Sequence, residues 1–284
     1  MNNDVRIGGF TILPPVVKNL LILNVLFFLA KIVCQKYGVD LDVWLGLHYF
    51  TADAYRPWQI VTYMFMHGNF AHLFFNMFAL WMFGAVVENY WGSKRFLLFY
   101  LITGVGAAMV QYGVMAYSTA RVMAVCNQFL DAPTIDNLMS IRGQFGTKSE
   151  IYKLLTTEYI NPLTANPGDM ERWGRCINDI TYLRDNWPNL LPACIGASGA
   201  VFGLLLAFGM LFPNSQIYLY FLIPMKAKWF VILYGLLELF FGVSGAADGV
   251  AHFAHLGGML FGILLILLWR KKDRSRQYNG WNEY

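Results

Sequence analysis

The sequence predicts an all-α membrane protein, a bundle of six transmembrane helices with a helical insertion outside the membrane between the third and fourth helices. Hydrophobic residues make up 57% of the 284 residues. Charged residues make up only 13%, about half the share usual in a soluble domain. The apolar residues gather in six segments near the length that crosses a bilayer, and one long polar segment separates the third from the fourth.

The six expected spans cover residues 16–33, 72–87, 96–117, 198–212, 229–243 and 250–269. A full span needs about 20 apolar residues, and several of these segments are shorter. Short or glycine-interrupted helices are tolerated inside a bundle when neighbouring groups satisfy the backbone, and such places tend to be functional.

Lysine and arginine residues orient the bundle. The short loops on the side of the N-terminus hold more of them than the opposite loops, and the last residues add Arg270, Lys271, Lys272, Arg274 and Arg276. The positive-inside rule therefore predicts that both termini are cytoplasmic. Residues 1–15 lack the pattern of a cleaved signal peptide. We expect a multi-pass protein of the bacterial plasma (inner) membrane.

The chain divides into four regions. Residues 1–117 hold the N-terminal segment, the first three spans and outer loop 1. Residues 118–191 form the polar helical insertion, which we expect on the non-cytoplasmic side. Residues 192–269 hold the last three spans, and residues 270–284 form a basic cytoplasmic tail.

Four cysteines occur without a CxxC pair, so a zinc cluster is not expected. Cys34 and Cys194 lie in apolar segments and are expected to be buried thiols. Cys126 and Cys176 both fall in the insertion. They could pair in an oxidising compartment or remain free, and their spacing leaves both states open.

A serine and a histidine are the main candidates for chemistry. Ser198 lies at the start of the fourth span and His255 near the start of the sixth. Glycines at helical spacing flank both residues: Gly196, Gly199 and Gly203 near the serine, Gly258 and Gly262 after the histidine. Small residues at this spacing let two helices approach closely. We therefore expect Ser198 and His255 to meet as nucleophile and general base.

A second polar group begins the second span. His67, His72 and Asn76 lie close together in sequence, and His72 and Asn76 are four residues apart on one helix face. They could form interhelical hydrogen bonds or donate to a developing oxyanion. Metal binding by His67, His72, His252 and His255 is not expected, because no HExxH motif or suitably spaced carboxylate accompanies them.

Two further roles for polar residues are a third catalytic group and a transport path. Asp248 precedes His252 by four residues and His255 by seven, but an Asp at a helix entry is more often a cap. We therefore expect a Ser–His dyad. A channel or transporter would need polar residues along the helices, and Asn24, Gln111 and Glu238 are isolated.

These motifs, in this order, resemble the rhomboid family of intramembrane serine proteases. The resemblance rests on Gly196 to Gly199, on His255 with its two glycines, on His67 with His72 and Asn76, and on Glu88 with Gly92. It implies a rhomboid-like six-helix bundle with Ser198 as nucleophile and His255 as base and acid. It also implies oxyanion donors from His72, Asn76 and the Ser198 N–H, a polar cavity that includes His67, and a structural role for Glu88.

Two positions depart from the family pattern. The first outer loop has Trp58-Gln59 where Trp-Arg is frequent, and Phe202 stands where some members stack a tyrosine on the histidine. The resemblance implies an endopeptidase that cleaves transmembrane segments of membrane proteins through an acyl-enzyme, with no cofactor or metal. Its partners would be membrane proteins and the lipid bilayer, with no nucleic acid. An inactive relative that binds transmembrane clients is the alternative.

Overall fold

The structure, a computed structural model, describes residues 10–219, 223–244 and 250–279. These residues are largely helical, and a short antiparallel hairpin joins two of the helices. Its strands are β1 (Gln216–Leu219) and β2 (Ile223–Lys226), with Gln216 opposite Lys226. The all-α membrane fold class is confirmed.

Five helices among the described residues are long and apolar enough to cross a bilayer. They are α1 (Pro15–Lys36), the helix Phe70–Trp91, α6 (Ser93–Asp131), α12 (Ala227–Ser244) and α13 (His252–Asn279). The second consists of α4 (Phe70–Ala79), a π-helical turn (Leu80–Gly84) and α5 (Ala85–Trp91). The outer loop before it carries α2 (Leu41–Leu45), α3 (Gln59–Thr62) and a 3-10 turn (Tyr63–Phe65).

The sixth expected span is the short helix α11 (Ser198–Leu211). Its 14 residues rise about 21 Å at 1.5 Å per residue, whereas the hydrocarbon core of a bilayer is about 30 Å thick. At least one end of α11 therefore lies inside the thickness of the membrane.

The core of the bundle is built around α11. Ten of its residues are buried, and α6 and α13 make its most extensive contacts. The backbones of α11 and α13 touch, because a Cβ atom added at Gly258 would overlap the carbonyl oxygen of Gly199. Glycine at position 258 is therefore required by this helix contact.

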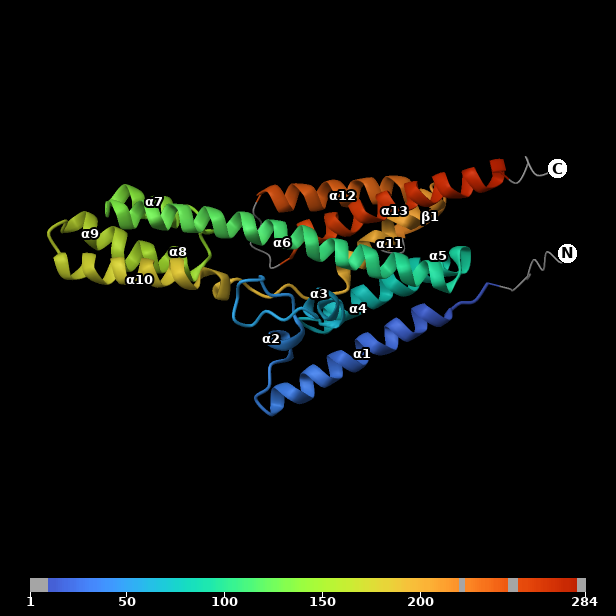
Figure 1. Cartoon of the computed structure of the whole chain (residues 1–284), viewed down its shortest axis with the longest axis horizontal. Coiled ribbons are helices and arrows are strands. Elements are labelled where there is room, and N and C mark those ends of the chain that lie inside the picture. The colour runs from blue at the N-terminus through green and yellow to red at the C-terminus, as the bar shows by residue number, and fades with distance from the viewer. Residues whose placement is uncertain (1–9, 220–222, 245–249, 280–284) are drawn as a thin grey trace.

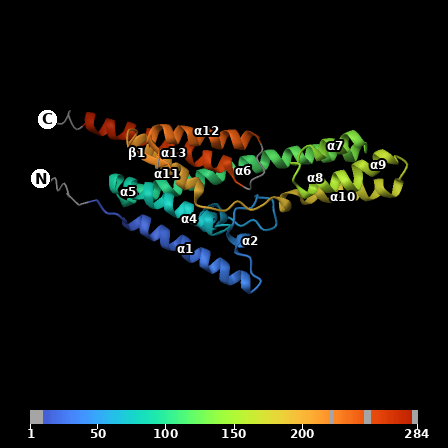
Figure 2. The ribbon, with the colours of Figure 1, turned by 180° about the vertical axis from the view of Figure 1, so that it is seen from behind.

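The helix α12 lies at the edge of the bundle (Figures 1 and 2). Only 17% of its apolar window is buried. Ala227, Val231 and Glu238 are its buried residues, whereas Leu236 and Phe240 are 59% and 65% exposed. The buried residues form a narrow stripe that contacts the bundle, and the remaining surface is suited to lipid.

The expected boundary of the insertion at residue 118 falls inside a helix. α6 continues without interruption for 39 residues to Asp131. The helices α7 (Ile135–Arg142), α8 (Glu150–Leu154), a π-helical turn (Leu155–Ile160), α9 (Asn161–Ala165) and α10 (Met170–Leu190) follow it. They lie at the opposite end of the molecule from the start of α1 (Figures 1 and 2). The insertion is thus a projection of the third span.

The insertion has a hydrophobic core of its own. Thirteen buried residues form it, including Phe129, Leu138 and Trp187. Cys126 and Cys176 are both completely buried there and are free thiols, so the disulfide alternative is not realised. Burial raises the pKa of Cys176 to about 12. This thiol is therefore protonated and unreactive at neutral pH.

Glu88 ties the start of the first span to the second and third. Its carboxylate accepts hydrogen bonds from the backbone N–H groups of Val16 at 3.0 Å and Val17 at 2.8 Å. The hydroxyl of Ser93 donates to it at 2.6 Å. The negative charge lies at the N-terminus of α1, where it accepts from two otherwise unpaired donors and interacts favourably with the helix dipole.

Substitution of Gly258 by Ala is expected to destabilise the bundle. The new methyl group would overlap the Gly199 carbonyl, and overpacking of this kind costs about 1–3 kcal/mol. Gly113→Ala is the matched control, because a Cβ at this helical position meets no atom within 4 Å. Thermal unfolding in detergent should show a lower Tm for Gly258→Ala and an unchanged or higher Tm for Gly113→Ala. Equal Tm values would contradict the close contact of α11 with α13.

Candidate active site

The segment before α11 is held by the outer loop. Leu47 and Cys194 exchange two backbone hydrogen bonds of 2.9 and 3.0 Å, and the N–H of Gly196 donates to the carbonyl of Tyr63 at 2.9 Å. Gly196 has a φ of +130°, which glycine adopts without strain. These contacts fix the direction in which the chain enters α11, and Ser198 is the first residue of that helix.

The structure brings Ser198 and His255 together. The Ser198 Oγ lies 2.8 Å from the Nε2 of His255. Phe202, one turn after the serine, stacks on the imidazole with ring centroids 4.2 Å apart and an interplanar angle of 6°. The stacking expected for Phe202 is therefore present. The ring limits rotation of His255 and keeps Nε2 directed at the hydroxyl.

A third side chain completes this group. The Oε2 atom of Glu238 on α12 lies 2.9 Å from the Nδ1 of His255 and 2.7 Å from the Nδ1 of His252. All three residues are buried. The sequence interpretation of Glu238 as an isolated polar residue is therefore wrong. Asp248, the carboxylate considered from sequence, lies outside the described residues.

His72 carries a donor near the serine, and Asn76 lies one turn further along α4. The N–H of Gly68 donates to the Nδ1 of His72 at 3.4 Å, which assigns the ring proton to Nε2. A Cβ at Gly196 would lie 2.8 Å from that Nε2 and 3.5 Å from the Ser198 Oγ. The His72 Nε2 and the Ser198 Oγ therefore both face the space beside Gly196. The Nδ2 of Asn76 is buried and has no hydrogen-bond partner among the described residues.

His67 is in contact with His72. Its ring is fully buried and meets the His72 ring edge-on, with centroids 5.1 Å apart. Burial, reinforced by His72, lowers the pKa of His67 to about 4. The Nζ of Lys31 donates to the His67 carbonyl at 3.0 Å and pairs with Asp42. His67 is thus a neutral ring that supports His72 and the start of α4.

Gln59 anchors the outer loop where arginine is frequent in the family. Its side chain is completely buried. The Oε1 atom accepts from the backbone N–H of Arg56 at 3.1 Å and of His48 at 3.3 Å. The Nε2 atom donates to the Ala54 carbonyl at 2.9 Å and reaches two carbonyls of α2. A neutral amide thereby joins α2, α3 and the chain between them.

Among the described residues, Glu238, His252 and His255 form a group that could hold a metal ion, because their ligand atoms lie within 4.8 Å of one another. Donor atoms around tetrahedral zinc are about 3.3 Å apart, given bonds of about 2.0–2.1 Å. The separations here are 2.7 and 2.9 Å, and both involve the same oxygen. This spacing fits direct hydrogen bonds better than shared coordination.

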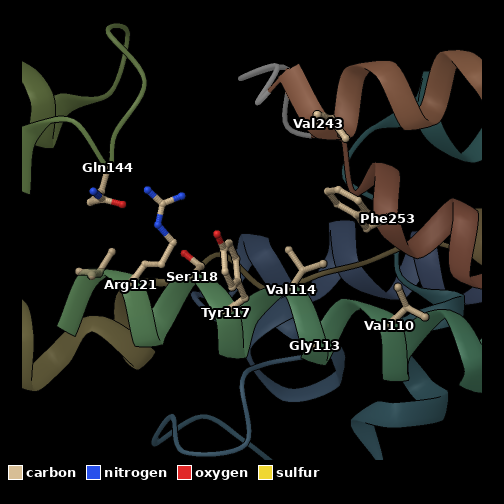
Figure 3. Close-up of a pocket in the computed structure, with 11 residues that line it drawn as sticks. Val110, Gly113, Val114, Tyr117, Ser118, Arg121, Gln144, Val243 and Phe253 are labelled. Atoms are coloured by element: carbon tan, nitrogen blue, oxygen red, sulfur yellow. The ribbon is translucent and has the colours of Figure 1, made fainter. Parts of the chain in front are cut away.

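A pocket of about 720 Å³ lies beside the start of α13 (Figure 3). Figure 3 shows Arg121 and Ser118 of α6 near Gln144 of the insertion, with Phe253 and Val243 at the other end. The pocket is lined by neither Ser198 nor His255. It is therefore distinct from the serine–histidine site, although Phe253 follows His252 directly in the chain.

Comparison with known proteins identifies related sequences. The family model of the Rhomboid domain matches residues 54–128 and 178–272. An uncharacterised mitochondrial rhomboid protein of Schizosaccharomyces pombe is 28% identical over 229 residues, which are 77% of this chain and 53% of that protein. The rhomboid protease GluP of Bacillus subtilis is 40% identical over 63 residues, 22% of this chain and 12% of that protein. This chain thus spans about half the length of the yeast relative.

A third relative is a chloroplastic rhomboid-like protein of Arabidopsis thaliana. It is 33% identical over 96 residues, which are 30% of this chain and 34% of that protein. Residues 129–177 of this chain, which lie between the two matched segments, fall in the insertion.

Replacement of Gln59 by Leu is expected to loosen the outer loop. The N–H groups of His48 and Arg56 would lose their acceptor in a buried site, at a combined cost of about 2–4 kcal/mol. Gln35→Leu is the control, because Gln35 is exposed. Thermal unfolding in detergent should give a clearly lower Tm for Gln59→Leu alone. Equal Tm values for the two variants would contradict the anchoring role.

Proposed function

The chain belongs to the rhomboid family, and from this premise we propose that it is an intramembrane serine endopeptidase. Its substrates are transmembrane segments of other membrane proteins. The observation that carries the proposal is the 2.8 Å contact between the Ser198 Oγ and the His255 Nε2. A serine hydroxyl and an imidazole nitrogen at hydrogen-bond distance are the arrangement that general-base activation requires. The name of the Bacillus subtilis relative, a rhomboid protease, supports the same activity.

The proposed reaction has two stages. The Ser198 oxygen attacks the carbonyl carbon of the scissile bond while its proton passes to His255. The tetrahedral intermediate then expels the amine, which receives that proton, and the acyl group stays on the serine. Water next attacks the ester with His255 again accepting a proton. Return of this proton to the serine oxygen releases the carboxylic acid and restores the enzyme.

The oxyanion of the tetrahedral intermediate needs donors in place before it forms. The His72 Nε2–H and the Asn76 amide are proposed to supply two of them. The backbone N–H of Ser198 is a third, because the first N–H groups of a helix have no partner within it. Gly196 leaves the space between His72 and Ser198 open for the substrate carbonyl.

We propose that this chemistry takes place below the membrane surface, which the short length of α11 supports. Ser198 is the first residue of a helix about 21 Å long, and loop rather than helix continues toward the end of the molecule that carries the insertion. Water is proposed to enter from that end, past the outer loop, and transmembrane substrates from the lipid side past α12. We propose that this end is non-cytoplasmic and that the start of α1 faces the cytoplasm, as the distribution of basic residues indicates.

Ser198→Ala is expected to abolish activity. Purified protein in detergent would be treated with a fluorescent fluorophosphonate, which labels activated serines. The wild type and Ser118→Ala, a change of another helical serine on α6, should label equally. Ser198→Ala should not label and should not cleave a transmembrane peptide. Folded wild type that neither labels nor cleaves would support the alternative of an inactive client-binding protein, and labelling that persists in Ser198→Ala would exclude Ser198 as the nucleophile.

Removal of the oxyanion donors is expected to slow the chemical step. Asn76→Ala and His72→Ala should each lower kcat about 10²- to 10³-fold, the effect of losing one oxyanion donor, with little change in KM. Asn24→Ala serves as control, since Asn24 is a buried asparagine whose one hydrogen bond among the described residues, at 2.7 Å, lies within α1. Steady-state cleavage of a transmembrane peptide measures both constants. Values of kcat for Asn76→Ala and His72→Ala equal to that of Asn24→Ala would contradict the assignment.

A further inference from the structure

The contact between Glu238 and two histidines has no place in a Ser–His dyad. Glu238 comes from α12, whereas His252 and His255 lie one turn apart on α13. One carboxylate oxygen lies 2.7 Å from one Nδ1 and 2.9 Å from the other. The side chains of the three residues are 8–10% exposed. This group is therefore a fixed network that connects two helices.

A carboxylate in an apolar helix is costly, and such residues are functional by default. Packing alone would be served as well by leucine, the residue on either side of Glu238 in the sequence. The two imidazoles compensate the charge, since both direct a ring nitrogen at the same oxygen. A buried charged group on a helix whose apolar window is only 17% buried calls for a chemical reason.

The carboxylate determines which nitrogen of His255 is basic. An ionised carboxylate only accepts hydrogen bonds, so the Nδ1 atom that contacts Glu238 must carry the ring proton. The Nε2 atom then holds a lone pair, and this is the atom 2.8 Å from the Ser198 Oγ. When Nε2 takes the serine proton, the ring becomes a cation held against the carboxylate. The two charges cancel in a buried site, where such an interaction is strong.

We propose that Glu238 is a positioning residue that makes a Ser198–His255–Glu238 triad of the proposed protease, and that His252 holds the carboxylate in place. The proposal rests on the proposed function. Glu238 stays ionised throughout: the serine proton moves to Nε2 and later leaves from Nε2, while the Nδ1 proton remains between His255 and Glu238. His252 donates a second hydrogen bond to Oε2 and does not exchange protons with Ser198.

The first experiment compares full-length variants in detergent. Glu238→Gln keeps the shape of the side chain, but its amide can donate to Nδ1 and so favour the wrong tautomer. We expect kcat for a transmembrane peptide and the rate of fluorophosphonate labelling to fall about 10²- to 10⁴-fold, with KM changed by less than about twofold. Glu238→Asp, which restores an acceptor, should recover at least about tenfold of this loss.

Glu88→Gln is the matched control. It removes the charge of another buried glutamate, whose hydrogen bonds hold α1 rather than the site. Its Tm should fall, but folded protein should label at the wild-type rate. If kcat of folded Glu238→Gln falls by less than about tenfold, or by no more than kcat of Glu88→Gln, the triad is overturned. If the wild type itself does not label, the proposed function fails instead, so the two failures are distinguishable.

The role of His252 has its own pair of variants. His252→Asn keeps an N–H donor close to the position of Nδ1, whereas His252→Leu removes it. The leucine variant should lose at least about tenfold in kcat and the asparagine variant should recover most of it. Equal rates for both variants would exclude the supporting role of His252.

A spectroscopic measurement separates tautomer control from general stability. The chain has only five histidines, so selective ¹⁵N labelling gives a simple spectrum, assigned by His255→Gln. In the wild type, the His255 Nδ1 should carry a proton and Nε2 should not. Glu238→Gln should shift the ring toward the Nε2–H tautomer, and Glu88→Gln should not. A wild-type His255 with its proton on Nε2 overturns the proposal whatever the kinetics.

Discussion

The contact of α11 with α13 at Gly199 and Gly258 is the constraint on which the site depends. No side chain separates the two backbones at this point. The hydroxyl of Ser198 and the ring of His255, each a few residues away, are therefore brought to 2.8 Å. A larger residue at position 258 would overlap the Gly199 carbonyl and push the two helices apart. The same two glycines, Gly199 and Gly258, thus permit both the close packing of the helices and the approach of the serine to the histidine.

Different parts of the chain determine the depth of the serine, the direction of the chain before α11 and the plane of the imidazole. The short length of α11 allows Ser198, at the start of the helix, to lie below the membrane surface. The outer loop sets the direction of approach, through Gln59 and the backbone pairing of Leu47 with Cys194. Phe202 fixes the plane of the imidazole. The long α6 supports α11 and α13 on one side and carries the insertion at its far end.

Sequence reasoning recovers features that depend on local spacing. The spans, the crossing of small residues, and the approach of Ser198 to His255 all follow from periods of three and four residues. The role of Glu238 was not predicted, because α12 is apolar on every side and no pattern indicates which face turns inward. The anchoring role of Gln59 was not predicted, because its hydrogen bonds are to the backbone of residues up to 16 positions away in an irregular loop. The continuation of α6 past residue 117 was readable, since neither glycine nor proline interrupts the chain from Val114 to Asp131.

The shallow burial of α12 has a consequence for the timing of the reaction. In the proposed protease, the helix past which substrates enter also carries the carboxylate that pairs with the imidazole. A displacement of α12 that admitted a substrate helix would withdraw Glu238 from His255 and leave the ring without its orienting partner. Hydrolysis would then begin only after α12 had returned to the bundle. Entry and bond cleavage would in this way be separated in time.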